Sequence, residues 1–529
     1  MITISRKWLL SILAVVMIAA MLVGCSDSNS AKNEPAKRNP ADNQSKDEVK
    51  KPPVTLKIEL FDRNNTPAGA PPITDNFFTK YMQENFGDPN NIKLEFVTVP
   101  RSEEVDKLNV LMAANQAPDL VFTYNTQTVE KYVKDGGLTD LGPLLDEFGP
   151  NLKTLYGDDV LSYGVFEGKQ YAIPAMRVIK AQSSTFIRQD WLDELNLPAP
   201  ATTDQFYETM KAFKAAKPKA FAYGGQIDYF HMHPLQYSFW DWANISDEDL
   251  YANVEWLMPG NKEAYRFLNK MYNEGLMDPD FPLSMGKDNN LFTKYLLNGQ
   301  IGAATTNTNE PVYMGYLAEL QKADPNARLS VIDPFTDVNG KTPKPAYSPL
   351  GIYMLVPKAS ERAEEVIKYL NWMAEPKNIL VLQNGTEGVT YTMNDGIPVT
   401  LDNDEAKNLL YNYFDYCIIL NGKYVSFTDE RLNIAANASD PNFRDFTVKS
   451  VETGSKDSIV KPRVLTPIES DIKHANTLKK KDEEIFVKVI TAKPANFDSV
   501  YDKEVADYLK IGGQEVMEEK RAAYKAEYK

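Results

Sequence analysis

The sequence predicts an α/β protein whose sheets are mainly parallel and whose body is divided into two lobes. From Val54 onward, short strand-like runs are followed by helix-like segments of roughly 10–15 residues, a pattern typical of sheets covered by helices. Residues 54–529 are too many for one sheet, so two lobes are the natural division. The composition, 43% hydrophobic and 25% charged, is that of an ordinary globular protein. It excludes a polytopic membrane protein, a wholly disordered chain and a fibrous repeat.

Each predicted element rests on its own local pattern. Residues 54–61 alternate like a strand, and residues 119–122 form a short apolar run typical of a buried strand. Ser102 is placed to cap a helix that ends before Pro118, and Thr202 with Gln205 forms a capping box for the next helix. Helical spacing predicts three more helices: 264–272 before Gly275, 363–373 before Pro376, and a charged helix over 500–529.

The N-terminus is predicted to be a lipoprotein signal peptide over residues 1–25. Arg6 and Lys7 precede an apolar run over residues 8–23, which is shorter than the roughly 20 residues a spanning helix needs. The run ends in LVGC, which resembles the lipobox of bacterial lipoproteins. The resemblance implies that Cys25 receives the lipid, with palmitate among its acyl chains, and becomes the mature N-terminus. A plain secretory signal with an accidental cysteine is the alternative.

Residues 26–53 are predicted to be a disordered tether. The segment holds no aromatic residue and a single valine among many Ser, Asn, Lys, Asp and Pro residues, so it cannot bury enough surface to fold. We therefore expect a folded body that is held at the outer face of the cell membrane through its N-terminal lipid alone.

Charge and residue counts exclude several classes of function. The net charge of −15 offers no broad basic face, so we expect no nucleic-acid partner. Two cysteines, Cys25 and Cys417, and three histidines make a disulfide framework and a zinc site unexpected. The oxygen-rich stretches 278–280 and 337–340 lack the full ligand spacing of a calcium loop and are expected to be turns. We expect no cofactor and no metal, although a structural calcium ion is not excluded.

Eight segments along the body occur together in the order typical of one family. They are 111–122 (LMAANQAPDLVF), 132–141 (YVKDGGLTDL), 168–174 (GKQYAIP), 187–195 (IRQDWLDEL), 202–206 (TTDQF), 271–279 (MYNEGLMDP), 298–302 (NGQIG) and 384–388 (NGTEG). With the lipobox, they resemble the extracellular solute-binding lipoproteins of Gram-positive ABC (sugar-type) importers, the group related to maltose-binding protein.

This resemblance implies a periplasmic-binding-protein-like fold and a transport function. Two lobes would be joined by crossing hinge strands, with a small-molecule ligand, an oligosaccharide by preference, held between them and delivered to ABC permease subunits by a monomer. By analogy, lobe 1 comprises residues 54–172 and 307–351, and lobe 2 comprises residues 173–306 and 352–529. The chain would cross near residues 172–174, 306–309 and 347–354.

A sugar site needs flat aromatic rings and side chains that donate or accept hydrogen bonds. Residues 228–244 (DYFHMHPLQYSFWDWAN) are the densest aromatic and polar cluster, so Trp240, Asp241 and Trp242 are candidate ligand contacts, with lobe core as the alternative. His231 and His233 are expected to make ordinary polar contacts.

Further candidates follow from position at strand ends and predicted crossings. They are Asp62, Arg63, Tyr124, Arg177, Asn307, Tyr347 and Glu387, with Asn125, Asn309, Glu310 and Tyr353 beside them. Solvated loop positions or hinge hydrogen bonds are the alternative for each. Arg63 and Arg177 together favour a ligand with carboxylates, because guanidinium pairs with carboxylate through two hydrogen bonds.

Three functions remain open from the sequence. The first is carbohydrate capture for import, without chemistry. The second keeps the fold but binds a peptide or presents a ligand to a sensor. The third is a secreted glycoside hydrolase that works through two carboxylates. We expect a binding protein rather than an enzyme, because the sequence holds no nucleophile elbow, phosphate loop or zinc motif.

Overall fold

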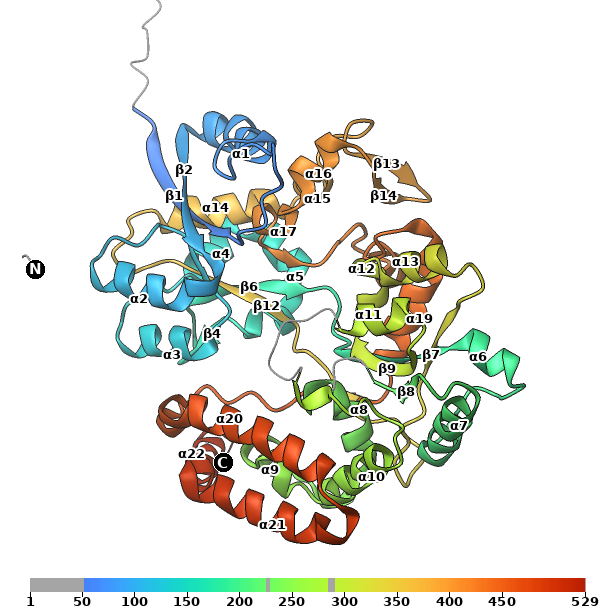
Figure 1. The fold of residues 1–529 in the computed structure, drawn as a ribbon. Coiled ribbons are helices and arrows are strands. Elements are labelled where there is room, and N and C mark those ends of the chain that lie inside the picture. Colours follow the sequence, from blue (N-terminus) through green and yellow to red (C-terminus); the bar gives the residue numbers. More distant parts are fainter. Residues whose placement is uncertain (1–51, 225–228, 284–290, 529) are drawn as a thin grey trace, which may run out of the picture. The chain divides into compact units, whose positions relative to one another are not determined.

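The computed structural model describes residues 52–224, 229–283 and 291–528, and residues 52–529 form one compact unit (Figure 1). The predicted signal peptide, Cys25 and nearly all of the predicted tether lie outside the described residues. Within the described ranges, no helix is both long enough and apolar enough to cross a membrane.

The first lobe is built on a two-stranded sheet and a four-stranded sheet, which an isolated bridge links. Strand β1 pairs in parallel with β2 and is joined to the segment before β3 by a bridge between Ile58 and Leu120. The four-stranded sheet has the order β3-β12-β6-β15, in which β12 runs antiparallel to both of its neighbours. The strands are β1 (Val54–Asp62), β2 (Ile92–Pro100), β3 (Val121–Thr123), β6 (Ala172–Arg177), β12 (Leu350–Leu355) and β15 (Leu420–Asn421).

Nine helices belong to the described part of this lobe, and the strands pack against them. Leu56 and Leu60 of β1 share one core with Val366 and Leu370 of α14, and all four are at most 1% exposed. The helices are α1 (Phe77–Met82), α2 (Glu104–Ala113), α3 (Thr126–Lys134), α4 (Gly142–Phe148), α5 (Pro150–Ser162), α14 (Ala363–Met373), α15 (Pro376–Asn384), α16 (Asp404–Leu410) and α17 (Tyr413–Tyr416).

The second lobe is built on a four-stranded sheet in the order β10-β7-β9-β8. Strand β7 runs antiparallel to β10 and β9, and β8 runs parallel to β9. The strands are β7 (Ser183–Arg188), β8 (Phe221–Tyr223), β9 (Ile301–Asn307) and β10 (Leu329–Ile332). The helices are α6 (Gln189–Glu194), α7 (Thr203–Ala216), α8 (Tyr229–Phe239), α9 (Asp247–Ala252), α10 (Asn261–Asn273), α11 (Leu291–Leu297), α12 (Glu310–Tyr313), α13 (Tyr316–Ala323), α18 (Glu430–Ala435), α19 (Arg444–Ser455), α20 (Glu469–Thr491), α21 (Phe497–Tyr508) and α22 (Gln514–Tyr528).

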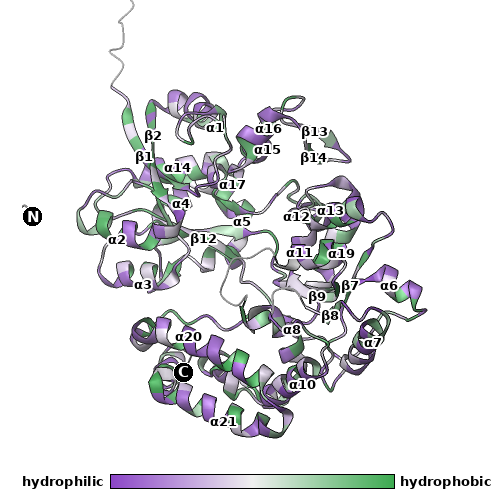
Figure 2. Cartoon of the chain, viewed as in Figure 1, coloured by the Kyte–Doolittle hydropathy of each residue, from purple (hydrophilic) through white to green (hydrophobic). Residues whose placement is uncertain are grey.

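The C-terminal helices extend the core of the second lobe. Phe486 and Val489 of α20 are fully buried beside Tyr265 of α10. Figure 2 shows that α20 and α21 carry mixed hydrophilic and hydrophobic residues, as expected for helices with one covered face. Three small two-stranded sheets complete the structure: β4 (Val165–Phe166) with β5 (Lys169–Gln170), β11 (Lys344–Pro345) with β16 (Ser458–Ile459), and β13 (Tyr391–Asn394) with β14 (Ile397–Thr400).

Most elements that were predicted from local patterns are confirmed. The first strand matches β1, and Thr202 caps α7 by accepting a hydrogen bond from the Gln205 backbone N–H at 3.2 Å. The Gln205 side chain accepts instead from the Ala201 backbone N–H at 2.8 Å, so the reciprocal bond of a capping box is displaced by one residue. Gly275 ends α10 with a φ of +71°, as predicted for a left-handed cap.

The prediction of mainly parallel sheets is wrong for the second lobe. Two of its three described strand pairings, β10 with β7 and β7 with β9, are antiparallel. Local alternation predicts that a strand exists, but its direction depends on the connection that brings it to its partner.

The predicted assignment of segments to the lobes is also corrected. Residues 310–332 stay in the second lobe, because β10 pairs with β7. Residues 363–421 belong to the first lobe, because α14 packs in its core and β15 pairs with β6. These pairings put the passages of the described chain between the lobes at residues 178–182, 346–349 and 422–429, whereas the predicted crossing near residues 306–309 lies within the second lobe.

Candidate functional site

A cavity of about 1020 Å³ opens between the two lobes, beside the three crossings. Each crossing contributes to its wall: Gln182 from the first, Tyr347 from the second and Lys423 from the third. The first lobe adds residues of β14, α16 and α17, and the second adds Asn307, Thr308, Asn309, Tyr313 and the loop before α19. A ligand in this space would touch both lobes and the segments about which they can move.

Amide, phenol and cationic side chains dominate the polar part of the cavity wall. The cations are Arg177, Lys407, Lys423 and Arg444, and the one carboxylate among the described lining residues belongs to Asp402. Asp402 is 90% exposed and pairs with Lys407 at 2.6 Å. The lining residues with an amide or a phenol side chain are Gln182, Asn307, Asn309, Tyr313, Tyr347, Tyr411, Tyr413, Asn421 and Asn437.

Arg177 ends β6 and is held in place by neutral groups. Its Nε donates to the Leu350 carbonyl at 3.2 Å, and its guanidinium lies 4.4 Å from the centre of the Tyr347 ring. Burial lowers the pKa of Arg177, and only the tyrosines Tyr347 and Tyr124 act against this. The Arg177 side chain is therefore held in place, but none of these partners is a carboxylate that could neutralise its charge.

Lys423 lies just after β15 and has a similar environment. Its amino group donates to the carbonyl of Gln383 and to Oδ1 of Asn384, the latter at 2.8 Å, and lies 3.9 Å from the centre of the Tyr413 ring. Burial lowers the pKa of Lys423 to about 7. Its backbone N–H donates to Asn437 Oδ1 at 2.9 Å, which links the third crossing to the second lobe.

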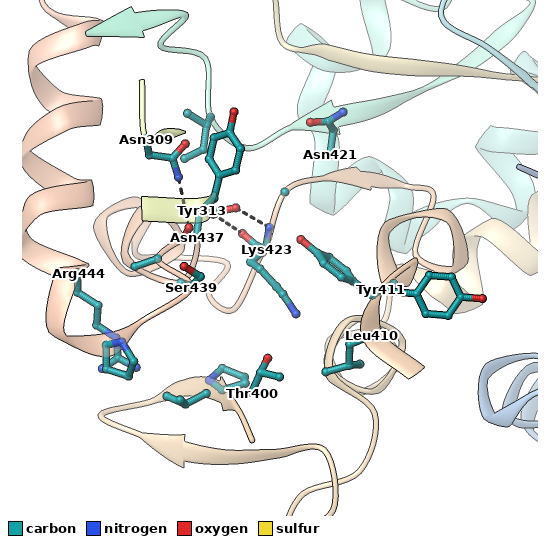
Figure 3. A pocket seen from close by; sticks show the side chains of 18 of the residues that line it. Asn309, Tyr313, Thr400, Leu410, Tyr411, Asn421, Lys423, Asn437, Ser439 and Arg444 are labelled. Atoms are coloured by element: carbon teal, nitrogen blue, oxygen red, sulfur yellow. Dashed lines mark hydrogen bonds between the residues drawn. The ribbon is translucent and has the colours of Figure 1, made fainter. Parts of the chain in front are cut away.

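Arg444, at the start of α19, carries a third cation to the cavity wall. Its Nη1 donates to Asn394 Oδ1 at 2.7 Å, while Nη2 is buried without a hydrogen-bond partner. The nearest carboxylate, that of Asp395, lies 4.0 Å away and is 91% exposed. Figure 3 shows Asn309, Asn437 and Ser439 on one side of the space, with Thr400 and Leu410 opposite.

Three of the ten predicted ligand contacts meet at this cavity. Arg177, Asn307 and Tyr347 line it. Asn307 is held by Glu310, whose Oε2 accepts from both the backbone and the side-chain nitrogen of Asn307 at 3.2 Å. Their contact with ligand stays a prediction, but the structure brings them together.

A second group, Asp62, Arg63 and Tyr124, gathers at the ends of β1 and β3. Arg63 makes a two-pronged ion pair with Asp415, at 2.7 and 2.8 Å, and its Nη2 lies 3.4 Å from the Tyr124 hydroxyl. The Asp415 side chain is only 1% exposed. Asp62 is exposed and accepts from the Asn64 backbone N–H at 2.8 Å, as in a turn. Arg63 is thus neutralised within the lobe, so it does not form a free pair with Arg177.

The tryptophan cluster packs inside the second lobe. Trp240 is 2% exposed, packs at a tilt against Tyr237 with ring centres 4.2 Å apart, and donates from Nε1 to Asn261 at 3.0 Å. Trp242 donates to the Tyr237 carbonyl at 2.9 Å. Asp241 is exposed and accepts from the Asn244 side chain. None of the three lines the cavity: Trp240 lies in a small core of the second lobe, Trp242 packs against that core, and only Asp241 is exposed.

Glu387, His233 and Cys417, which the sequence also singled out, lie outside the cavity wall. Glu387 is exposed in the turn before β13. His233 contacts Glu255 at 3.0 Å, a polar contact as expected. Cys417 is fully buried, and burial raises the pKa of its thiol to about 12. A thiol in that state is a poor nucleophile.

The oxygen-rich stretches form turns. Asp337 Oδ1 accepts from the backbone N–H groups of Asn339 and Lys341, and Asp278 Oδ1 accepts from that of Asp280. In the described part of the chain, no three His, Cys, Asp or Glu side chains are grouped so that they could hold a metal ion.

Sequence reasoning missed the lining residues beyond position 398, above all Lys423, Asn437 and Arg444. Lys423 lies in the third crossing, Asn437 in the loop after α18 and Arg444 at the start of α19, and no hydrophobic period marks these positions. Strand β15, which brings Lys423 beside the first crossing, has only two residues. The pairing of Asn421 with Arg177 that places it there is visible only in three dimensions.

Comparisons with known proteins agree with this architecture. Lipoprotein LipO of Bacillus subtilis (strain 168) is 25% identical over 429 residues, which cover 77% of this chain and 78% of LipO. The polygalacturonan/rhamnogalacturonan-binding protein YtcQ of the same organism is 23% identical over 459 residues, covering 82% and 86%. The crystal structure of the alginate-binding protein AlgQ2 without calcium ion superposes with a TM-score of 0.63 at 19% identity, covering 89% and 98% of the two chains. This likeness confirms the predicted two-lobe fold.

The family assignment rests on a match to a family model over more than half of the chain. Residues 70–379 match the model of the bacterial extracellular solute-binding proteins. These residues include the sheets of both lobes apart from β1 and β15, as well as the first two crossings. The chain therefore belongs to the bacterial extracellular solute-binding protein family.

Proposed function

We propose that this protein captures an oligosaccharide in the cavity between its lobes and delivers it to the permease of an ABC transporter. The observation that carries the proposal is the cavity itself, which all three crossings and both lobes line. A ligand that contacts both lobes stabilises the closed arrangement over the open one, which gives a permease a ligand-dependent surface to recognise.

The chemistry of the wall supports a carbohydrate. Amide side chains both donate and accept hydrogen bonds, as the hydroxyl rims of sugars require, and tyrosine rings offer flat faces for their C–H groups. Asn307, Asn309, Asn437, Tyr313 and Tyr347 supply both kinds of group. The relative YtcQ is named for polygalacturonan and rhamnogalacturonan binding, which fits the same class of ligand.

Binding without chemistry is the proposed mode of action. Hydrolysis of a glycoside generally uses two carboxyl groups that flank the bond. Asp402 is the single carboxylate among the described lining residues, and it pairs with Lys407. The family and the matched relatives are named as binding proteins or lipoproteins.

We also propose that Cys25 carries the lipid and that residues 26–53 tether a monomeric body to the outer face of the membrane. The lipobox-like LVGC sequence and the naming of LipO as a lipoprotein support this. A tether of this composition lets the body stand off the membrane and still reach a permease.

The test uses the chain without residues 1–25, since all of the described cores lie beyond residue 52. Oligosaccharides, neutral and acidic, and short peptides are titrated by calorimetry and by thermal unfolding. Ligand at a hundred times its Kd should stabilise the fold by about 2.7 kcal/mol. Chromatography should recover the glycan intact. Binding of peptides alone, or cleavage of the glycan, would contradict the proposal.

A matched pair of variants locates the site. Ser439 faces the cavity, and Ser439→Trp places an indole in it. Ser499→Trp makes the same change at an exposed position of α21. We expect the first variant to lose binding at least tenfold and the second to bind as the unmodified chain does. Equal affinities of the two variants would place the ligand elsewhere.

A further inference from the structure

Several of the most deeply buried cations of this protein are paired with carboxylates. Arg188, Lys344 and Lys481 have side chains that are 4–11% exposed, and each pairs with a carboxylate at 3.1 Å or less. Arg63, at 22%, pairs with Asp415. This is the usual arrangement, because an unmatched charge that loses water is costly.

Arg177 and Lys423 depart from that arrangement. Both are half-buried, and their partners are carbonyl oxygens, an amide and tyrosine rings. In the described ranges, neither makes an ion pair with a carboxylate. Burial lowers the pKa of both groups, although the chain as a whole has a net charge of −15.

The two cations also lie close together on neighbouring segments. Arg177 of β6 is opposite Asn421 of β15 in a parallel pairing, and the Val178 backbone N–H donates to the Asn421 carbonyl at 2.9 Å. Lys423 is two residues further, beyond a bend at Gly422. Arg444, with its unpartnered Nη2, faces the same cavity from the second lobe.

We infer that the ligand of this cavity is an acidic oligosaccharide whose carboxylates pair with Arg177 and Lys423, with Arg444 as a third cationic contact. The inference rests on the proposed function and names its substrate class. A carboxylate can accept two parallel hydrogen bonds from a guanidinium, and a lysine supplies a compact positive charge beside it. A neutral sugar would leave both charges unmatched when the lobes close.

The test compares each acidic trisaccharide with its neutral methyl ester, and both with a neutral reference sugar. Trigalacturonate and trimannuronate are titrated beside their fully methyl-esterified forms and maltotriose, with the chain that lacks residues 1–25. In at least one pair, the acid should bind roughly 10- to 100-fold more tightly than its ester. Added salt should weaken binding of the acid and leave the ester nearly unchanged.

Variants test whether the two cations, Arg177 and Lys423, cause the preference for the acid over its ester. Arg177→Gln and Lys423→Met should each weaken acid binding roughly tenfold or more while changing ester binding less than about threefold. Arg177→Lys keeps the charge but not the two parallel hydrogen bonds, so it should bind the acid more tightly than Arg177→Gln and more weakly than the unmodified chain. Lys131→Met, at an exposed position of α3 outside the cavity, changes the net charge equally and should leave every affinity unchanged. Thermal unfolding of each variant confirms that it is folded.

The outcomes separate this inference from the proposed function. If esters or maltotriose bind as tightly as the acids, or if the acid-to-ester ratio survives in both Arg177→Gln and Lys423→Met, the inference is overturned and sugar capture stands. If no saccharide of either charge binds the folded chain, the proposed function fails and the inference fails with it.

Discussion

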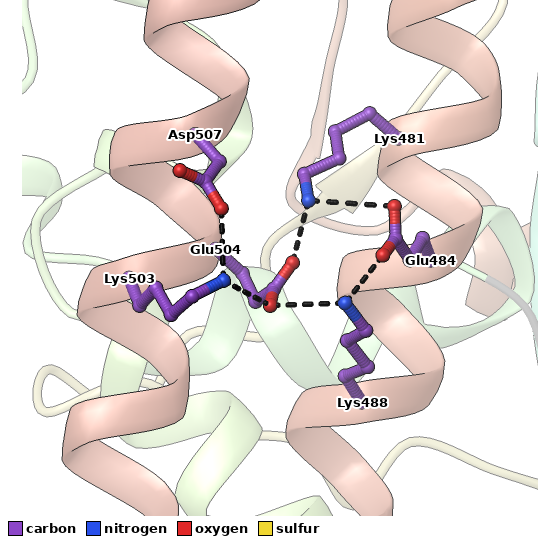
Figure 4. A network of polar contacts seen from close by, with 6 residues as sticks. All are labelled: Lys481, Glu484, Lys488, Lys503, Glu504 and Asp507. Carbon is purple, nitrogen blue, oxygen red and sulfur yellow. Dashed lines mark hydrogen bonds and ion pairs between the residues drawn. The ribbon is translucent and has the colours of Figure 1, made fainter.

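Glu504 is the centre of an ion-pair network between α20 and α21 (Figure 4). Its side chain is 5% exposed and accepts from Lys481 at 2.5 Å, Lys488 at 3.0 Å and Lys503 at 3.2 Å. Burial alone would raise the pKa of Glu504, but the three lysines outweigh it and lower the pKa to about 2. We predict that Glu504→Gln destabilises the protein in a way that depends on pH.

The magnitude follows from the pKa. An ordinary glutamate titrates near 4.5. A folded-state pKa of about 2 therefore contributes about 3 kcal/mol of stability at neutral pH. Because the folded pKa is the lower one, this contribution is complete above pH 4.5 and is lost as the pH falls toward 2. Glu504→Gln should thus cost about 3 kcal/mol at pH 7 and progressively less below pH 4.5.

Urea unfolding followed by tryptophan fluorescence measures this cost at pH 7, 4 and 3. Asp507→Asn is the matched control, because Asp507 pairs with Lys503 but its side chain is 46% exposed. An exposed pair of that kind should contribute less than about 1 kcal/mol. The reasoning is refuted if Glu504→Gln costs no more than the control at pH 7, or if its cost is the same at pH 3.

Three further predictions concern other strained or sequestered positions. Burial raises the pKa of Glu59 to about 8, so the stability of the unmodified chain falls between pH 4.5 and 8; Glu59→Gln should raise the melting temperature at pH 8, and not at pH 5. Lys344→Met leaves the half-buried Asp333 without its 3.1 Å partner and should lower the unfolding free energy in urea by about 3 kcal/mol. Gly260 has a φ of +88° and a Cβ there would lie 1.9 Å from a carbonyl oxygen, whereas Gly275 at +71° has open space. Gly260→Ala should therefore destabilise by clearly more than the roughly 1 kcal/mol expected for Gly275→Ala, as measured by thermal unfolding.

Local sequence patterns predicted elements well, because a cap or a helical stripe depends on residues within one or two turns. Thr202 and Gly275 end up at the helix boundaries that their chemistry favours. The membership of each element in a lobe was not predictable in the same way. Strand β10 stays with β7 because of a pairing between segments about 140 residues apart, and no local feature of residues 329–332 records that.

The candidate site was predicted in part for a similar reason. Arg177, Asn307 and Tyr347 were found because strand ends and crossings concentrate ligand contacts, and the structure places all three at the cavity. Trp240 and Trp242 were chosen for their density of aromatic side chains, which is equally typical of a packed core. Their indole N–H groups are both bound within the second lobe.

Whether an arginine offers its charge to a ligand cannot be decided from its own position in the sequence. Arg63 and Arg177 both follow strands and are equally plausible ligand contacts by that criterion. Arg63 is neutralised by Asp415, which lies 352 residues further along the chain and whose side chain is only 1% exposed. Arg177 instead faces the cavity beside Lys423, and the groups that hold it are neutral. Charge compensation is a three-dimensional property. We therefore base the inference of an acidic ligand on Arg177 with Lys423, and not on Arg63 with Arg177 as the sequence suggested.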